Sequence, residues 1–507
     1  MLLDQIVENA ARRAADTPAI ITSAGAVSFA ELDARVNARA SWLASRAGPG
    51  DRVAILAENR IEYVECLYAT ARAGLVAAPL NHRLHPSEWR DLLMKCSATL
   101  VIAEDPFAGA LEPYLEGTAV SIHDFDFEAG ADREELARAA VAVTAITPRS
   151  EADVAWLIAT SGTTGLPKWA MLTHRSLTAG ITNLGLARPI AVDDVLLTPF
   201  PMCHVAVYNV LAFHLHARPV VLMARFDPDL MNGLIAHEGV RTLSLAPTMI
   251  AAWLDAPSTF TTDLHTLRTI GYGASAIPAP VLQRAQTLGV DLSQGYGMTE
   301  LSGNAAFLGP DEHRAAAAGD ERRLRAAGRA GPLAALKIVD DDVEVDPGES
   351  GEIWVRGDQV CAGYWDDPDA TAASFRADGW FRTGDLGTID PDGLLTIVDR
   401  MKDVIVTGGE NVASREVEQV LEHHPAVREV AVIGVPDMTW GENVCAVVVP
   451  VDPEFPPTLD DLVALCRERL AGFKKPKHLV VLDELPKNAT GKVQKSALRA
   501  AYGGDPG

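Results

Sequence analysis

The chain has 507 residues, more than one hydrophobic core usually serves, so at least two domains are expected. Hydrophobic residues make up 48% of it and charged residues 22%, the balance of a folded globular protein. The formal net charge is −24, and because its field would repel nucleic acid and anionic membranes, neither is expected as a main partner.

The N-terminal residues predict an amphipathic helix, because Leu3, Ile6, Val7 and Ala10 recur at helical spacing with acidic residues between them. A secretory signal would need a basic start and a continuous apolar stretch, and no apolar run along the chain is long enough to span a bilayer. The cysteines are scattered without a CxxC pair: Cys66, Cys96, Cys203, Cys361, Cys445 and Cys466. A cytoplasmic protein with reduced thiols and no structural metal site is therefore expected.

From residue 52 the sequence alternates short β-rich runs with helical ones. A helix is expected at 61–74, and strands at 52–58, 75–81, 98–104, 154–160, 194–200, 218–224 and 241–247. This alternation predicts a parallel sheet with helices on both faces. The stretch HRAAAAGDERRLRAAGRAGP (313–332) has no evident chemical role and is expected to be solvated surface.

The sequence pattern changes at about residue 335, from alternating strands and helices to strands separated by turns. Strands are expected at 335–340, 351–357 and 394–400, with turn sequences such as DPGESG and DPDG between them. From 401 a compact unit follows, with helices at 415–424 and 459–471 and strands at 427–435, 443–450 and 477–485. We therefore expect an α/β fold with a large domain over 1–400, which has parallel or mixed sheets and a β-rich subdomain over about 335–400. A small α+β domain over 401–507 completes it.

The segment SGTTGLPK follows the strand expected at 154–160 and is suited to holding a polyphosphate. Its glycines let backbone N–H groups approach phosphate oxygens, its hydroxyls add donors, and Lys168 supplies charge. An ordinary turn rich in Ser, Thr and Gly is the alternative. A Walker A loop is excluded, because the GK[ST] ending is absent.

Two further segments combine groups that nucleotides need. In QGYGMTE (294–300), Tyr296 could stack on a base, Thr299 could bond a phosphate and Glu300 could hold Mg²⁺, although a glycine turn with a surface glutamate would look similar. In GWFRTGDLG (379–387), Asp385 could accept hydrogen bonds from ribose hydroxyls, or it could bond its own backbone in a tight turn.

Two segments near the C-terminus are basic or glycine-rich. DRMKDVIVTGGENVASREVE (399–418) places Arg400 and Lys402 near the expected domain junction, ahead of a Gly-Gly pair. LPKNATGKVQK (485–495) carries Lys487, Lys492 and Lys495, and GFKKPKH (472–478) precedes it. In so acidic a chain this cluster implies an anionic ligand, with a solvated lysine face as the alternative.

Together, in this order and spacing, the five segments make the chain resemble the adenylate-forming superfamily, and within it the acyl-CoA synthetases, over nearly its whole length. The resemblance implies that a carboxylic acid attacks the α-phosphate of ATP, and that the thiol of coenzyme A then displaces AMP from the acyl-adenylate. ATP or the acyl-adenylate, Mg²⁺ and coenzyme A are the implied ligands. The expected pocket walls near 204–209, 271–276 and 295–304 are mostly small or apolar, so a hydrophobic acid is expected.

The resemblance also implies where the nucleotide binds. The β- and γ-phosphates would be held by Ser161, Thr163, Thr164 and Lys168. The adenine would be enclosed by Gly273, Ala274 and Tyr296, and the ribose would be held by Asp385 and Arg400.

The reacting groups are assigned in the same way. Thr299 would contact the α-phosphate, Glu300 would hold Mg²⁺, and Lys492 would bridge the substrate carboxylate and the α-phosphate where charge develops. Lys402 would be the hinge of a mobile C-terminal domain, whose rotation removes Lys492 and brings Gly408 and Gly409 alongside the pantetheine arm. His204 would lie where the acyl pocket meets the thiol tunnel, unless it is a buried core histidine.

One residue departs from the family pattern SGTTGxPKG, because Trp169 replaces its last glycine. The indole could point away and pack on a neighbour, or it could be an engineered substitution. It could also fill the space of the β- and γ-phosphates, since a glycine at a close approach is hard to replace. The chain would then catalyse only the reaction of an acyl-adenylate with coenzyme A and would depend on a separate adenylating enzyme.

The activities left open by the sequence are therefore that half-reaction, a complete two-step synthetase and transfer of the acyl group to a carrier protein. A protein that binds an acyl-adenylate without turnover is a further possibility.

Overall fold

The computed structural model describes residues 1–125, 149–160, 167–273, 277–407, 410–437, 440–488 and 492–503. The chain forms two compact units. Unit 1 comprises Met1–Leu336, Val355–Arg382 and Gly393–Leu395, and unit 2 comprises Lys337–Trp354, Thr383–Asp392 and Thr396–Gly507. Most of the β-rich stretch between 337 and 400 thus groups with the C-terminal residues. Among the described residues, no helix combines the length and the hydropathy that a membrane crossing requires.

The first sheet of unit 1 has the strand order β6-β5-β3-β4-β7-β8. All its neighbouring strands run parallel except the hairpin of β7 and β8. The strands are β3 (Arg52–Leu56), β4 (Val76–Pro79), β5 (Ala98–Ala103), β6 (Ser121–His123), β7 (Val154–Thr160) and β8 (Lys168–Thr173). The helices between them are α3 (Ile61–Arg72), α4 (Pro86–Cys96) and α5 (Asp105–Leu111). The predicted parallel α/β arrangement is confirmed here, because apolar runs buried on both faces form its inner strands.

A second sheet of unit 1 has the order β15-β14-β13-β12-β11-β9-β10-β1-β2, with parallel pairs from β13 through to β1. Its strands are β1 (Pro18–Thr22), β2 (Gly25–Ser28), β9 (Leu196–Thr198), β10 (Val220–Leu222), β11 (Thr242–Leu245), β12 (Thr269–Gly273), β13 (Asp291–Met298), β14 (Gly303–Leu308) and β15 (Ala326–Ala330).

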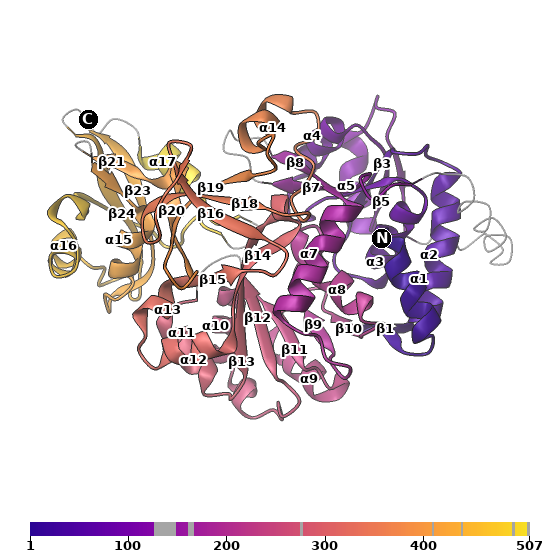
Figure 1. Cartoon of the computed structure of the whole chain (residues 1–507), viewed down its shortest axis with the longest axis horizontal. Helices are drawn as coiled ribbons and strands as arrows, with labels where there is room; N and C mark the ends of the chain where they lie inside the picture. The colour runs from indigo at the N-terminus through magenta and orange to yellow at the C-terminus, as the bar shows by residue number, and fades with distance from the viewer. Residues whose placement is uncertain are drawn as a thin grey trace. The chain divides into compact units, whose positions relative to one another are not determined.

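Helices surround these sheets, and α1, α2 and α3 lie side by side (Figure 1). The remaining helices of unit 1 are α1 (Asp4–Arg13), α2 (Phe29–Ala44), α7 (His174–Ala187), α8 (Tyr208–Leu215), α9 (Pro228–Glu238), α10 (Pro247–Asp255), α11 (Ala279–Gln286), α12 (Pro310–Ala317), α13 (Glu321–Arg325) and α14 (Pro368–Ser374). The amphipathic helix predicted at the N-terminus is α1, and its residues Ile6, Val7 and Ala10 are buried.

The expectation that 313–332 is solvated surface is wrong in part. The stretch forms most of α12, all of α13 and β15. His313 is buried, and its Nε2 lies 2.8 Å from the hydroxyl of Tyr272 on β12. The alanines on its inner side, Ala316, Ala326 and Ala327, are buried as well, whereas the arginines face outward. Alanine is common both on exposed helix surfaces and in tightly packed cores, so composition alone did not distinguish exposed from buried alanines in this stretch.

Five strands pair in the order β17-β16-β18-β19-β20, and most of their residues belong to unit 2. They are β16 (Ala335–Asp340), β17 (Val343–Glu344), β18 (Ser350–Arg356), β19 (Phe381–Ile389) and β20 (Leu395–Arg400). Unit 2 also holds the sheet β22-β21-β24-β23, with β25 paired to β24. Those strands are β21 (Ile405–Thr407), β22 (Glu410–Val412), β23 (Val427–Asp437), β24 (Gly441–Pro450) and β25 (His478–Val481). The helices are α15 (Ser414–Leu421), α16 (Leu459–Arg467) and α17 (Lys495–Tyr502), in agreement with the predicted α+β unit.

Candidate active site

The hairpin of β7 and β8 separates Lys168 from Trp169. Successive side chains of a strand point to opposite faces of its sheet. Ile158 and Ala170 accordingly pack in one core cluster, whereas Leu157 and Trp169 pack in the cluster on the other face. Lys168 therefore points to the face opposite the indole.

The indole of Trp169 is fully buried, with 0% of the residue exposed. It lies among apolar side chains of α4 and the neighbouring strands, and its Nε1 donates a hydrogen bond to the carbonyl of Leu92, 3.3 Å away. This is the first of the three interpretations of the substitution, in which the side chain packs on neighbours. The loop residues expected to hold the β- and γ-phosphates, Ser161, Thr163 and Thr164, lie outside the described residues.

On the other face, Lys168 and Glu300 meet at Tyr364. The Lys168 Nζ lies 5.0 Å from the centre of the Tyr364 ring, and the Tyr364 hydroxyl donates to Glu300 Oε1 at 2.9 Å. Burial, and the Glu300 carboxylate beside it, raise the pKa of Tyr364, so its hydroxyl keeps its proton and can donate. Segments far apart in the sequence thus place a cation over the ring of Tyr364 and a carboxylate at its hydroxyl.

Tyr364 reaches this position because residues 362–365 run alongside β8. Ala362 N–H donates to Met171 O, Met171 N–H donates to Gly363 O, and Trp365 N–H donates to Trp169 O, at 2.9, 2.9 and 2.8 Å. The Cys361 N–H also donates to the carbonyl of Glu300 at 2.8 Å, which fixes the backbone that carries the carboxylate. Sequence analysis missed Tyr364, and the available signal was an aromatic pair inside the glycine turn CAGYW.

The expected adenine site lies where β12 and β13 end side by side. A Cβ at Gly273 would come within 2.9 Å of the carbonyl of Gly295, so glycine is needed for this close approach. Tyr296, on β13, is buried, and Thr299 begins the short helix η5 (Thr299–Leu301) that carries Glu300. Ala274 lies outside the described residues.

His204 is partly buried and directly precedes the short helix η3 (Val205–Val207). Its carbonyl accepts a hydrogen bond from Val207 N–H at 3.1 Å. Tyr208 follows, and its hydroxyl accepts a hydrogen bond from Asn304 Nδ2 at 2.7 Å. Two of the three predicted pocket walls, 204–209 and 295–304, are thus joined.

In unit 2 the residues expected at the ribose lie together. The Arg400 Nε is 3.1 Å from Asp385 Oδ1, and 45% of the arginine side chain is exposed against 6% of the aspartate. The backbone N–H of Asp385 donates to the hydroxyl of Thr383 at 3.1 Å. Lys402 belongs to η6 (Met401–Asp403), while the side chain of Lys402 and the residues Gly408 and Gly409 are not among those described.

The lysines near the C-terminus differ in their surroundings. Lys474, Lys487 and Lys495 form ion pairs with glutamates of unit 2. Lys492 is exposed, and its backbone is fixed by N–H donation to Asn488 Oδ1 at 2.9 Å. The predicted cluster is therefore partly a structural set of ion pairs.

A second exposed cation in unit 2 lies against an aromatic ring. The Nζ of Lys477 is 4.7 Å from the centre of the Trp440 ring, and 49% of Trp440 is exposed. An exposed indole with a lysine over it can stack on a base and contact a phosphate. Sequence analysis had noted the lysine segment but had not singled out Trp440.

The described residues fit a magnesium ion that is bound mainly through phosphates. Among them, no group of three or more His, Cys, Asp or Glu side chains could enclose a metal ion. Glu300 is the carboxylate expected to bind it, and Mg²⁺ commonly binds through one or two carboxylates with phosphate oxygens and water.

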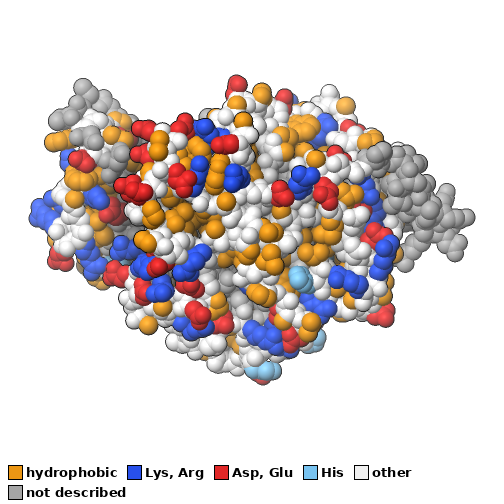
Figure 2. Space-filling model, in the orientation of Figure 1, with side chains coloured by type: hydrophobic (Ala, Val, Ile, Leu, Met, Phe, Trp, Pro, Cys, Tyr) orange, Lys and Arg blue, Asp and Glu red, His pale blue; other side chains and the backbone are white. Residues whose placement is uncertain are grey.

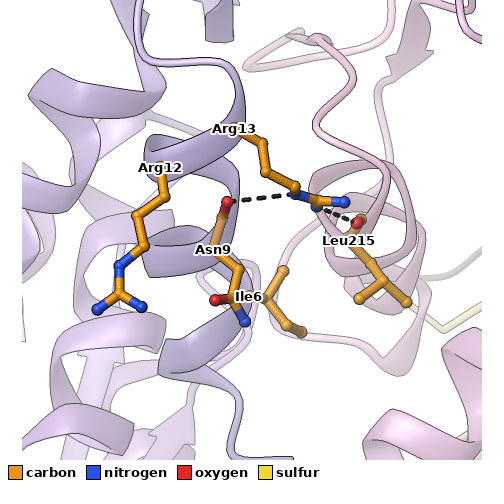
Figure 3. A pocket seen from close by; sticks show the side chains of 5 residues that line it. All are labelled: Ile6, Asn9, Arg12, Arg13 and Leu215. Carbon is orange, nitrogen blue, oxygen red and sulfur yellow. Dashed lines mark hydrogen bonds between the residues drawn. The ribbon is translucent and has the colours of Figure 1, made fainter.

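A pocket of about 360 Å³ lies elsewhere, between α1 and the end of α8 (Figure 3). Arg13 lines it and donates to the carbonyls of Asn9 and Leu215, at 3.2 and 2.8 Å, while Arg12 pairs with Glu8. None of the residues predicted for the nucleotide lines this pocket. On the face drawn in Figure 2, acidic and basic side chains are interspersed.

Comparison with known proteins gives consistent matches along the chain. A family model described as AMP-binding enzyme matches residues 7–365, and one described as AMP-binding enzyme C-terminal domain matches residues 416–492. The chain is 36% identical to a feruloyl-CoA synthase of an Amycolatopsis species, over 97% of each chain. It is 37% identical to an indoleacetate–CoA ligase of Aromatoleum aromaticum, over 93% of this chain and 92% of the other.

A solved structure with a similar fold supports the same family relationship. The o-succinylbenzoate CoA synthetase of Bacillus subtilis, in complex with its acyl-adenylate intermediate, superposes with a TM-score of 0.84. Its sequence is 29% identical, and 97% of each chain is covered.

Proposed function

The chain belongs to the AMP-binding enzyme family, and from that premise we propose that it is an acyl-CoA ligase that both adenylates a hydrophobic carboxylic acid and transfers the acyl group to coenzyme A. The observation that carries the proposal is the position of Trp169. Its indole is buried on the face of β8 opposite Lys168 and Glu300, so the side chain does not lie on the side where these two charged groups meet.

The residues of unit 1 are assigned to binding the triphosphate. Lys168 would offset charge on the β- and γ-phosphates, and Glu300 would hold Mg²⁺, which supplies positive charge to the phosphates. The hydroxyl of Tyr364 donates to one oxygen of Glu300 and thereby orients the carboxylate that would hold the metal ion. Thr299, at the start of η5, would contact the α-phosphate.

The residues of unit 2 are assigned to the ribose and to the reacting oxygens. Asp385 would accept hydrogen bonds from the ribose hydroxyls, with Arg400 beside it, and Lys492 would stabilise charge that develops between the carboxylate and the α-phosphate. Rotation about Lys402 would withdraw Lys492 after adenylation and bring Gly408 and Gly409 to the pantetheine arm. One site would then serve both reactions.

A second candidate function is the half-reaction alone, in which an acyl-adenylate made by a separate enzyme reacts with coenzyme A. The observation that favours it is the replacement of the family's glycine by Trp169 itself, which ties β8 to the Leu92 carbonyl directly after the phosphate loop.

Calorimetric titration separates these two functions without knowledge of the acid. We expect AMP and Mg-ATP to bind both the natural protein and Trp169→Gly, because the indole lies behind the strand. Binding of AMP to both proteins, combined with binding of ATP only to the glycine variant, would contradict the two-step proposal and favour the half-reaction.

Supply of an acyl-adenylate with coenzyme A distinguishes the remaining alternatives. Formation of the acyl-CoA supports a ligase, whereas tight binding of the adenylate without product would show a non-catalytic binder. Product formed only when a carrier protein replaces coenzyme A would show carrier transfer.

The adenine end of coenzyme A is assigned to Trp440, with Lys477 contacting its phosphates. Loss of one stacked base typically weakens binding by about 1–3 kcal/mol, so Trp440→Ala is expected to raise the KM for coenzyme A about tenfold. The kcat and the affinity for AMP should not change. Phe455→Ala is the control, since Phe455 is an aromatic residue of unit 2 that is 73% exposed. An equal rise in KM in both variants would contradict the assignment.

A further inference from the structure

Arg188 follows α7, is partly buried, and carries a guanidinium that no described residue pairs with. The residue caps the C-terminus of the helix, and its backbone N–H donates to the Leu184 carbonyl at 2.8 Å. The Nη2 atom is buried and has no hydrogen-bond partner among the described residues. No ion pair or side-chain hydrogen bond joins this guanidinium to any group that the structure describes.

The guanidinium lies against Gly271 of β12, which belongs to one of the walls expected for the acyl pocket. Its Nη1 occupies the space that a Cβ at position 271 would need, so any larger residue on β12 at this point would displace the guanidinium. Tyr272 points away from it, because its hydroxyl bonds Gln294 and His313. The charge of Arg188 also acts on the buried Tyr208, whose hydroxyl is bonded to Asn304. The side chain of Arg188 thus contacts the expected pocket wall at Gly271. It also acts electrostatically on Tyr208, which joins the other two expected walls through Asn304.

Among the described residues, Asp194 influences the charge of Arg188 without forming an ion pair with it. Asp194 interacts with it electrostatically, but the Asp194 Oδ2 accepts a hydrogen bond from the Ala191 backbone N–H at 2.7 Å. A guanidinium offers five N–H donors, and leaving buried donors unpaired is costly. Burial lowers the pKa of Arg188, which agrees with this environment. A group retained at such a cost is suited to a ligand that completes its hydrogen bonds.

We propose that Arg188 determines the specificity of the ligase by binding an acceptor oxygen of the acid, a ketone or a second carboxylate, remote from the carboxylate that is activated. The inference rests on the proposed function, and it narrows the substrate from hydrophobic acids in general to acids that carry such an oxygen. Two N–H donors of the guanidinium can bond one carboxylate, and one or two can bond a ketone. A plain hydrocarbon acid leaves them unpaired.

Three matched acids test this: phenylpropanoate and its para-acetyl and para-carboxyl derivatives. Each is supplied as its acyl-adenylate with coenzyme A, so the assay does not depend on ATP. The natural protein is expected to use at least one of the two derivatives with a kcat/KM at least about tenfold above that of phenylpropanoate, because a site built for a polar group discriminates strongly against its absence. A preference for the para-acetyl derivative would indicate that Arg188 binds a ketone, and a preference for the para-carboxyl derivative would indicate that it binds a second carboxylate.

The variant Arg188→Met keeps a long side chain without the donors. It is expected to lose the preference for the oxygen-bearing acids while its kcat/KM for phenylpropanoate stays the same or rises. It should also unfold at a higher temperature in the absence of ligand, since an unpaired buried charge is removed. Arg90→Met, at an exposed site on α4, is the control and should change neither property.

A natural protein that prefers phenylpropanoate, or an Arg188→Met variant that keeps the same preference as the natural protein, would overturn the inference. Failure of all three adenylates to react in the natural protein and in Arg90→Met would contradict the proposed function instead. In that case calorimetric titration with the three free acids tests the role of Arg188. The natural protein must bind an oxygen-bearing acid more tightly than phenylpropanoate, and Arg188→Met must lose this difference in affinity.

Discussion

Trp169→Gly is expected to lower the free energy of unfolding by about 3–5 kcal/mol, the loss typical when a large buried aromatic side chain is removed. The indole is fully buried beneath α4, and its Nε1 bonds the Leu92 carbonyl. Glycine would leave a cavity in that cluster and would also add backbone freedom to β8. Chemical denaturation, followed by a signal from unit 1, measures the change.

Two controls show whether burial is the cause. Trp440→Gly removes the same atoms from a residue that is 49% exposed, and it is expected to cost no more than about 1 kcal/mol. Trp169→Phe keeps most of the apolar contact and loses the hydrogen bond to Leu92, with an expected cost of about 1–2 kcal/mol. Equal, small losses for Trp169→Gly and Trp440→Gly would show that the indole is not packed in the core. The phosphate-site interpretation would then regain its basis.

The sequence predicts the scaffold well, because its strongest signals are local. The strand expected at 154–160 is β7 with the same bounds, and the helix expected at 61–74 is α3. Continuous apolar runs between helical segments are sufficient to indicate buried parallel strands. Charged and glycine residues in five spaced motifs are likewise sufficient to indicate the family.

The side chains that complete the site depend on contacts between distant segments. Tyr364 lies beside Lys168 only because residues 362–365 pair with β8, nearly two hundred positions away in the sequence. Arg188 is followed by a proline at the end of a helix, a pattern typical of an exposed helix terminus, and its burial against Gly271 is a result of tertiary packing. The direction of the Trp169 side chain depends in the same way on which face of β8 is covered by α4.

Asp385→Asn is expected to weaken AMP binding about a hundredfold, because hydrogen bonds to a charged acceptor contribute about 1.5–3 kcal/mol each. The carboxylate is buried, and Arg400 lies 3.1 Å away, so its orientation is fixed for accepting hydrogen bonds from the ribose hydroxyls. An amide of the same shape offers a single acceptor oxygen. Calorimetry with AMP measures the loss, and the reaction of an acyl-adenylate with coenzyme A should slow at low adenylate concentration.

A modified nucleotide shows whether the loss of AMP affinity in Asp385→Asn comes from the contact with the ribose. Deoxy-AMP lacking the 2′-hydroxyl should bind the natural protein more weakly than AMP, whereas Asp385→Asn should bind the two nucleotides with nearly equal affinity. Such non-additivity is the sign of a direct contact. Asp378→Asn, at an exposed carboxylate before β19, is the matched control and should bind AMP normally. If Asp385→Asn distinguishes the two nucleotides as strongly as the natural protein does, another group holds the ribose, and the ion pair with Arg400 serves only to link β19 to the end of β20.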